Sequence, residues 1–142
     1  MKIKSGSFAE LLLLHNQIPE LSPVANSDYF NTRIGNKSSL LLIGEVNEVA
    51  VAYKLGYWIN SDCFYSWLGG VHPDYRKRGA AKSLLLEQER RVREMGAKEI
   101  RVKSMNQYQS MLLLLISQGY AITGVQLNAQ GKEKILFSKK FV

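Results

Sequence analysis

The stretch "VHPDYRKRGAAKSLLLEQ", Val71–Gln88, changes character in its middle, and the expected fold is built around it. It begins like the end of a strand, passes through a Pro-Asp turn and continues as an amphipathic helix. The cations Arg76, Lys77 and Arg78 come directly before the small residues that open this helix. Cations beside the positive end of a helix dipole are unfavourable by roughly a few tenths of a kcal/mol each. A bound anion would remove that conflict, so the stretch predicts an anion site.

The small residues Gly79, Ala80 and Ala81 fit the same prediction, because they let a bulky anion approach the backbone N–H groups closely. The alternative is that they only allow close packing of the helix on a sheet, with an exposed basic run before it. The stretch is not a P-loop, since G-x-x-x-x-G-K-[ST] is absent, and it does not contain G-x-G-x-x-G. A nucleotide site of either of those two types is therefore excluded.

Length and composition indicate one soluble domain over residues 1–142, with 46% hydrophobic and 22% charged residues. A single cysteine, Cys63, excludes an internal disulfide and favours a reducing compartment. The apolar runs Leu11–Leu14 and Met111–Ile116 are too short for a signal peptide core or a membrane span. We therefore expect a cytoplasmic protein.

The net charge of +7 raises the possibility of nucleic-acid binding. However, the cations between Arg76 and Lys103 alternate with glutamates along an expected helix face, and a second group lies between Lys132 and Lys140. This distribution favours a solvated surface for most of the charge and a binding site only for the first cluster.

Outward from this stretch, hydrophobic periodicity predicts the order βααβββαβαββ and a mixed sheet with helices packed on it. Ser7 and Glu10 have the spacing of a capping box, and Gly96 and Gly119 follow two helices. The expected helices are Ser7–Gln17, Asp28–Ile34, Ala81–Met95 and Gln107–Gln118. The expected strands are Met1–Lys4, Ser39–Gly44, Glu48–Tyr57, Cys63–Val71, a segment around Ile100 and Val102, Tyr120–Leu127 and Lys134–Phe141.

Two motifs in this order resemble signatures of the GNAT N-acetyltransferase superfamily. Arg76-x-x-Gly79-x-Ala81 after a strand resembles R/Q-x-x-G-x-G/A, and "SMNQYQSMLLLLISQGY" resembles the second signature, an Asn opening a helix that ends in Gly-Phe or Gly-Tyr. With "FYSWLGGV", the set is similar to a bacterial GNAT branch whose members mostly lack an assigned substrate. The resemblance covers nearly the whole chain and is most specific between Phe64 and Val125.

The resemblance implies an α/β fold of mixed α+β type: a GNAT-like central mixed sheet of six to seven strands, splayed in the middle and flanked by about four helices. It also implies acetyl-CoA as cosubstrate, held in the gap between strands Cys63–Val71 and Glu99–Lys103. The residues implied in its binding are the backbone of Gly70 and Val71, the amides from Arg78 to Lys82, the charges of Arg76, Lys77 and Lys82, and the side chain of Asn106; the turn residues Gly79, Ala80 and Ala81 belong to that amide run. For Asn106, a simple helix N-cap is the alternative.

The usual acid–base positions of the family are apolar in this chain. Trp67 or Leu68 occupies the place of the customary strand Glu, and Leu115 lies four residues before Gly119, where many members have a Tyr. The sequence therefore names no catalytic residue. The weaker candidates are Tyr108, Ser110 and Tyr120 as proton donors and Glu45 or Asp62 as a distant base, each more simply explained as structural or solvated.

Other chemistries find less support. Cys63 has no partner histidine in a motif, and His15 and His72 are isolated, so neither a thiol nucleophile nor a metal site is expected. The aromatic residues Tyr57, Trp58, Tyr65 and Trp67 are either core residues or the lining of a substrate pocket.

Two functions remain open at this point. The first is acetyl-CoA-dependent acetylation of a primary amine on a small molecule, peptide or protein. The second is a non-catalytic domain of the same fold that senses acyl-CoA or binds nucleic acid. The resemblance further implies a possible homodimer and an acceptor site built from Ser7–Ile34 and Leu127–Lys132, which carry no readable motif.

Overall fold

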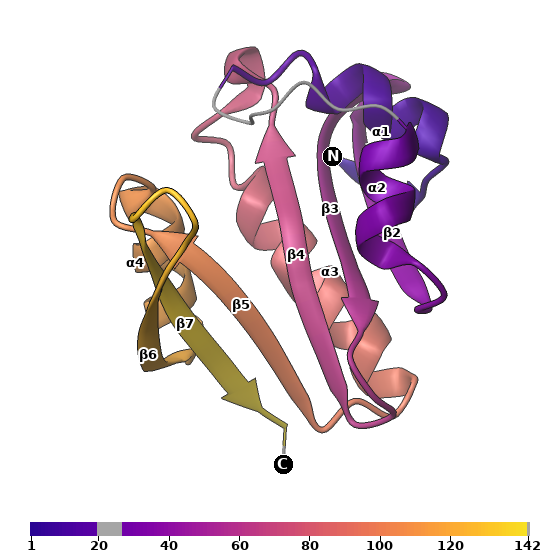
Figure 1. Ribbon diagram of the computed structural model, residues 1–142. Coiled ribbons are helices and arrows are strands. Elements are labelled where there is room, and N and C mark those ends of the chain that lie inside the picture. The colour runs from indigo at the N-terminus through magenta and orange to yellow at the C-terminus, as the bar shows by residue number, and fades with distance from the viewer. Residues whose placement is uncertain (20–26, 142) are drawn as a thin grey trace.

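The computed structural model describes residues 1–19 and 27–141, and its elements follow the predicted order (Figure 1). The sequence also predicts that Pro19 and Pro23 close the first helical region, and Pro23 lies outside the described residues. The elements are β1 (Lys2–Ser5), α1 (Phe8–His15), α2 (Ser27–Ile34), β2 (Ser39–Val46), β3 (Val49–Trp58), β4 (Cys63–Val71), a 3-10 turn η1 (Pro73–Tyr75), α3 (Ala80–Glu94), β5 (Glu99–Met105), α4 (Gln109–Ser117), β6 (Ala121–Leu127) and β7 (Glu133–Lys140).

The seven strands form one mixed sheet in the order β1-β2-β3-β4-β5-β7-β6. Neighbouring strands run antiparallel except β4 and β5, which are parallel and are joined through α3. That parallel pair is short: it runs only from Cys63 opposite Glu99 to Ser66 opposite Val102. Beyond it the two strands diverge, as Figure 1 shows, so the predicted splayed sheet is confirmed.

An irregularity in β4 lies at the point where the strands part. Leu55 of β3 pairs with Leu68, whereas its neighbour Gly56 pairs with Ser66, so Trp67 is the extra residue of a β-bulge. A bulge bends its strand and increases the local twist. Gly56 is needed opposite it, because a Cβ there would lie 2.4 Å from the Phe64 ring and 2.5 Å from the Tyr65 carbonyl oxygen.

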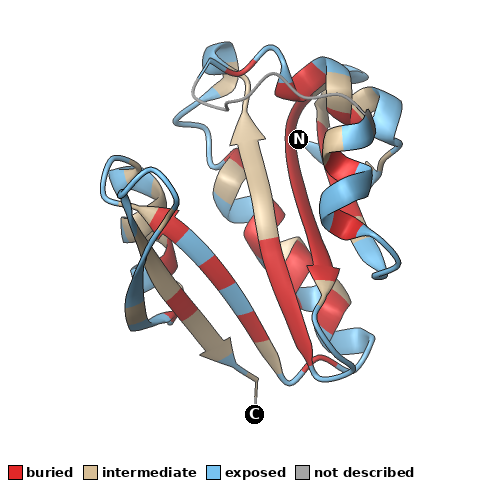
Figure 2. Cartoon of the chain, viewed as in Figure 1, coloured by how far each residue is buried: buried red, intermediate tan, exposed pale blue. Residues whose placement is uncertain are grey.

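The helices cover both faces of the sheet at β2 and β3, in agreement with the continuous runs of buried residues along these strands. Leu41 and Ile43 belong to a core cluster with α1 and α2, whereas Leu42, which points the other way, packs in a cluster with α3. On β5, Ile100 and Val102 are buried on the α3 and α4 side, while Arg101 and Lys103 are exposed on the other side (Figure 2). The β5 end of the sheet is therefore covered by helices on one face more completely than on the other.

Local signals in the sequence placed most helix ends to within one residue, but α4 begins at Gln109, two residues after the predicted Gln107. The capping box at α1 is present: the Glu10 N–H donates to Ser7 Oγ at 3.2 Å, and the Ser7 N–H donates to Glu10 Oε1 at 3.1 Å. The helix ends at His15, two residues before the predicted end. Met95, predicted in the buried stripe of α3, is 60% exposed, because the helix ends at Glu94 and Met95 has left its register.

Within the described residues, no helix is long and apolar enough to cross a membrane.

Candidate functional site

The diverging strands leave two backbone edges facing each other without a ladder between them. On β4 this edge runs from Trp67 to Val71, past the last parallel pair at Ser66, and on β5 it runs from Lys103 to Met105. The other edges of both strands are paired, β4 with β3 and β5 with β7. Backbone N–H and C=O groups are strong hydrogen-bonding groups that need partners when water is excluded. An extended polar ligand could fill this gap by bonding to both edges.

The amino end of α3 lies just beyond the open end of β4 and has the backbone of an anion site. Gly79 is its N-cap residue in the left-handed conformation, with φ 81°, and Lys77 is also left-handed, with φ 62°. Left-handed residues within a turn direct successive N–H groups toward one side, which forms an anion-binding concavity. The first intrahelical bond there is donated by the Ser83 N–H to the Gly79 carbonyl, so the amides of Ala80, Ala81 and Lys82 remain for a ligand.

No side chain of the described residues caps this helix end, and its first turn contains no acid. A Cβ at Gly79 would meet nothing within 4 Å, so the glycine serves the left-handed backbone and leaves open space above it. Arg76, Lys77, Arg78 and Lys82 are all exposed around this end. The free amides, the open space and the positive charge together fit a phosphate or pyrophosphate group.

Two of these cations are partly held by the turn itself. The Arg76 Nε donates to the Val71 carbonyl at 3.2 Å, which ties the turn to the end of β4. The Arg78 guanidinium lies 5.4 Å from the centre of the Tyr75 ring, on η1. Such contacts position the cations at the mouth of the gap between β4 and β5.

Asn106 follows the end of β5, on the far side of the gap from Gly70 and Val71. The alternative of an N-cap is wrong for this residue: the N-cap of α4 is Tyr108, and the helix begins at Gln109. The Tyr108 N–H bonds to the Met105 carbonyl at 2.9 Å, so a turn separates strand and helix and leaves Asn106 exposed on it. A role for its side chain in ligand binding stays a prediction.

The structure explains why the customary acid–base positions offer no proton-transfer group here. Leu115 is fully buried among the residues between α4 and the sheet. Trp67 packs on the other face, where its ring lies near Tyr29, Phe30 and Tyr57 and the Arg33 guanidinium lies 5.1 Å above it. Both positions therefore serve packing.

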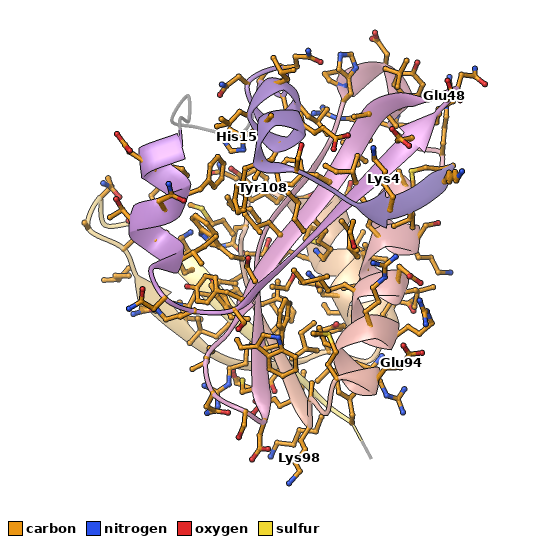
Figure 3. The ribbon with its side chains drawn as sticks, turned by 90° about the vertical axis from the view of Figure 1, so that its right-hand side faces the viewer. Lys4, His15, Glu48, Glu94, Lys98 and Tyr108 are labelled. Carbon is orange, nitrogen blue, oxygen red and sulfur yellow. The ribbon has the colours of Figure 1, made fainter. Side chains whose placement is uncertain are left out.

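Most of the weaker catalytic candidates are also accounted for. The Tyr120 hydroxyl donates to Glu89 Oε2 at 2.7 Å, and burial together with this carboxylate raises its pKa above the usual range. Glu45 pairs with Lys4 near the outer strand of the sheet. Asp62 lies 3.9 Å from Lys98, and Figure 3 shows Lys98 at the lower edge of the molecule and Tyr108 in its upper half. Tyr108 and the exposed Ser110 remain beside the open end of the gap.

The isolated sulfur and imidazole groups are structural. Burial raises the pKa of the Cys63 thiol, which opposes formation of the reactive thiolate. His15 Nδ1 lies 2.6 Å from the buried Tyr53 hydroxyl, and His72 Nδ1 accepts the Asp74 N–H at the start of η1. Among residues 1–19 and 27–141, no three His, Cys, Asp or Glu side chains gather as a metal site would require.

A buried polar layer between α3 and the sheet was missed from the sequence. Lys54 is 5% exposed and pairs with Gly69, and burial lowers its pKa to about 8 while the Glu89 charge opposes the shift. Ser66 Oγ and both polar atoms of the Gln88 side chain are buried without a hydrogen-bond partner among the described residues. The sequence offered one signal for this layer, the polar Gln88 in the apolar stripe of the expected α3 helix. The position of Lys54 in the middle of β3 gave no indication that the lysine is buried.

A cavity of about 420 Å³ lies against the strands around the apex of the gap. Tyr57 and Tyr65 are core residues, each only 7% exposed, and both also border the cavity, whereas Trp58 and Trp67 are not among its lining residues. That these aromatic residues line a substrate pocket stays a prediction. The remaining lining residues come from α2, from the residue after β3, and from β5, β6 and β7: Arg33, Ile59, Glu99, Arg101, Val102, Lys103, Thr123, Gln126, Leu136, Phe137 and Ser138.

Comparison with known proteins agrees with this geometry. The model of the acetyltransferase (GNAT) family matches residues 9–113. Among solved structures, the ribosomal-protein-S18-alanine N-acetyltransferase from Escherichia coli superposes with a TM-score of 0.83 at 15% identity, covering 98% of this chain and 92% of that one. Ard1 from Thermoplasma volcanium gives 0.84 at 14% identity, covering 99% and 97%.

A third structure, a GNAT family acetyltransferase from Elizabethkingia anophelis with acetyl-CoA bound, gives a TM-score of 0.78 at 14% identity and covers 99% of this chain and 97% of that one. At such identities these structures are evidence of a shared fold. No protein of curated function matches the chain in sequence.

Proposed function

Since the chain belongs to the GNAT family of acetyltransferases, we propose that it transfers the acetyl group of acetyl-CoA to a primary amine of a small molecule, peptide or protein. The observation that carries this proposal is the continuity of two features. The unpaired edges of β4 and β5 lead directly to the left-handed turn and free amides at the start of α3. A ligand with a long polar arm and a pyrophosphate would use both.

In this proposal the amides of Ala80, Ala81 and Lys82 bind the pyrophosphate, with charge supplied by Arg76, Lys77, Arg78 and Lys82. The backbone of Gly70 and Val71 bonds the pantetheine arm from one side, and Asn106 approaches it from the other. The acetyl-CoA-bound relative from Elizabethkingia anophelis supports acetyl-CoA as the donor. The buried thiol of Cys63 is not needed for transfer.

Transfer requires that the amine nitrogen attack the thioester carbonyl carbon, that the carbon–sulfur bond break, and that the proton lost by the amine be taken up. The chain contributes chiefly by positioning the two substrates and by backbone hydrogen bonds, since neither Leu115 nor Trp67 has a side chain that can act as a general acid or base. We propose that water accepts the amine proton and returns a proton to the CoA thiolate as it leaves, since Tyr108 and Ser110 lie beside the open end of the gap rather than at its apex.

The proposal is tested by acetyl-CoA binding and CoA release. Acetyl-CoA at a hundredfold excess over its Kd should stabilise the fold by about 2.7 kcal/mol, visible as a rise in Tm. The variants Arg78→Ala and Lys82→Ala should weaken acetyl-CoA binding by roughly tenfold, since each removes a charge-assisted contact. Lys98→Ala changes an exposed lysine next to the paired end of β4 and β5 rather than the open end, and is the matched control. An unchanged Tm with acetyl-CoA and with CoA refutes the proposal.

The second candidate is a non-catalytic domain that senses acyl-CoA. The burial of Leu115 and the aromatic packing of Trp67 favour this candidate, because packed side chains without an acid–base group occupy both positions that usually transfer protons in the family. It predicts acetyl-CoA binding without CoA release across a broad panel of amines. A nucleic-acid-binding domain predicts instead a strongly salt-dependent affinity for DNA or RNA and no effect of CoA.

A further inference from the structure

The cavity beside the apex of the gap carries an excess of positive charge from separate elements. Arg33 comes from α2 and Arg101 and Lys103 come from β5, and the only carboxylate in its lining is Glu99. Glu99 is already engaged, with its Oε2 3.0 Å from Arg101 Nε and accepting the Ser138 hydroxyl at 2.6 Å. Arg33 and Lys103 are thus left as the unneutralised charges of this surface.

A third cation, Lys134 of β7, interacts electrostatically with both Arg33 and Lys103. Its pKa is lowered, first by burial and then by the charges of Lys103 and Arg33. None of these three cations lies within ion-pair distance of a carboxylate in residues 1–19 and 27–141. Three like charges brought together from α2, β5 and β7 repel one another, and an anion bound among them would relieve that repulsion.

The aromatic residues hold two of these charges in place. The Arg33 Nε donates to the Tyr57 hydroxyl at 3.1 Å, while its guanidinium carbon lies 5.1 Å from the Trp67 ring centre. The Lys103 Nζ lies 5.7 Å from the centre of the Tyr65 ring. Cations held over aromatic rings at the wall of a cavity are positioned to meet a ligand.

The position of the cavity connects it with the transfer reaction. Val102 is in the last parallel pair of β4 and β5, and Lys103 is the first β5 residue beyond it, so the cavity borders the apex of the gap. The anion site at the start of α3 lies at the open end of the same gap. A thioester arm that enters from the open end would present its reactive end toward the apex, beside the cavity.

We propose that this cavity binds the acceptor, and that the acceptor is a small primary amine carrying a carboxylate or phosphate that Arg33 and Lys103 of the lining recognise, with the charge of the neighbouring Lys134 in support. The inference rests on the proposed acetyl transfer. A volume of about 420 Å³ lies within the range of small-molecule sites, which favours a small amine over a protein segment. The walls formed by Tyr57 and Tyr65 would contact the apolar part of such a molecule.

The test compares amines that carry an acid group with matched amines that lack it, each offered as an acceptor. β-Alanine is paired with β-alaninamide, phenylalanine with phenylalaninamide, and O-phosphoethanolamine with ethanolamine; CoA release and product mass are measured. The amines with an acid group should be acetylated with a kcat/KM at least tenfold above that of the amines without one. The phosphate and carboxylate members of the panel distinguish the two anionic groups. A short acidic peptide used in preference to all of them would overturn the inference of a small acceptor.

Variants then assign the preference to the cavity. Lys103→Gln and Lys134→Gln should each raise the KM for the preferred acid by about tenfold while leaving the KM for acetyl-CoA unchanged. Lys140→Gln, an exposed lysine of the same strand β7, is the control; both lysines lie outside the cavity lining, but the charge of Lys134 acts on the lining residues Lys103 and Arg33. The inference is overturned, with acetyl transfer left intact, if amines with and without an acid group are acetylated equally well. It is also overturned if Lys140→Gln raises the KM for the preferred acid as much as Lys103→Gln and Lys134→Gln do.

Binding provides a measurement that does not depend on turnover. In the wild-type protein with CoA, O-phosphoethanolamine or β-alanine should raise the Tm, and Lys103→Gln should abolish that rise. If no amine is acetylated and neither acid raises the Tm although acetyl-CoA does, the cavity does not bind such acceptors and the inference fails on its own. If acetyl-CoA also leaves the Tm unmoved, the proposed function fails with it.

Discussion

Replacement of the buried Lys54 by methionine should stabilise the protein at neutral pH. Lys54 lies in β3 opposite Gly69, and its side chain points toward α3, since its neighbours Tyr53 and Leu55 pack on the other face. Burial lowers its pKa from 10.5 to about 8. Methionine keeps a flexible chain of similar length and removes the charge.

The magnitude follows from linkage between protonation and folding. The native state binds this proton more weakly than the unfolded chain, so between pH 8 and 10.5 unfolding takes up a proton and stability rises with pH. Below pH 8 the cost of keeping the buried ammonium charged is fully present. A pKa lowered from 10.5 to about 8 corresponds to about 3 kcal/mol. Lys54→Met should gain up to that amount at pH 7 and progressively less as the pH approaches 10.5.

Urea unfolding followed by the fluorescence of Trp58 and Trp67 measures this at pH 7 and pH 10. The difference between wild type and variant is the decisive quantity, because the titration of other groups cancels in it and any packing change is independent of pH. Lys98→Met, whose lysine side chain is 75% exposed, is the control and should show no such trend. A stability difference between wild type and Lys54→Met that is the same at both pH values would refute the reasoning.

Three further substitutions test other parts of the structure. Ser7→Ala removes the capping box with Glu10 and should cost about 1 kcal/mol in urea unfolding, with no change in acetyl-CoA binding. Gly79→Ala forces a side chain into the left-handed region at φ 81°; it should cost about 1–2 kcal/mol and weaken acetyl-CoA binding measured by calorimetry, and unaltered affinity would contradict the proposed pyrophosphate site. Tyr120→Phe removes the hydrogen bond to Glu89 and should cost about 1.5–3 kcal/mol while kcat in the folded variant is retained; a selective loss of kcat would instead make Tyr120 a catalytic residue.

Much of the fold could be predicted because its signals are local. The capping box at Ser7, the alternation around Ile100 and Val102, and the glycine after each long helix reflect interactions within a few residues. The same holds for the anion site at the start of α3, where the turn, the small residues and the cations are contiguous in sequence. The errors were also local: Met95 and the end of α1 lie at helix ends, where the periodic pattern has no clear boundary.

The rest depended on tertiary structure because it joins residues from distant segments. Nothing in the sequence around Lys54 indicates that β3 is an interior strand of the sheet, with α3 covering that lysine. Likewise, Arg33, Lys103 and Lys134 are three unrelated cations until α2, β5 and β7 bring their charges together, with Arg33 and Lys103 lining one cavity. The sequence by itself determined the order of elements and the anion site proposed for the pyrophosphate of acetyl-CoA, since both follow from neighbouring residues. Only the packing of the sheet decided where the strands part, which polar groups are buried and which charges meet, because these depend on contacts that no local pattern encodes.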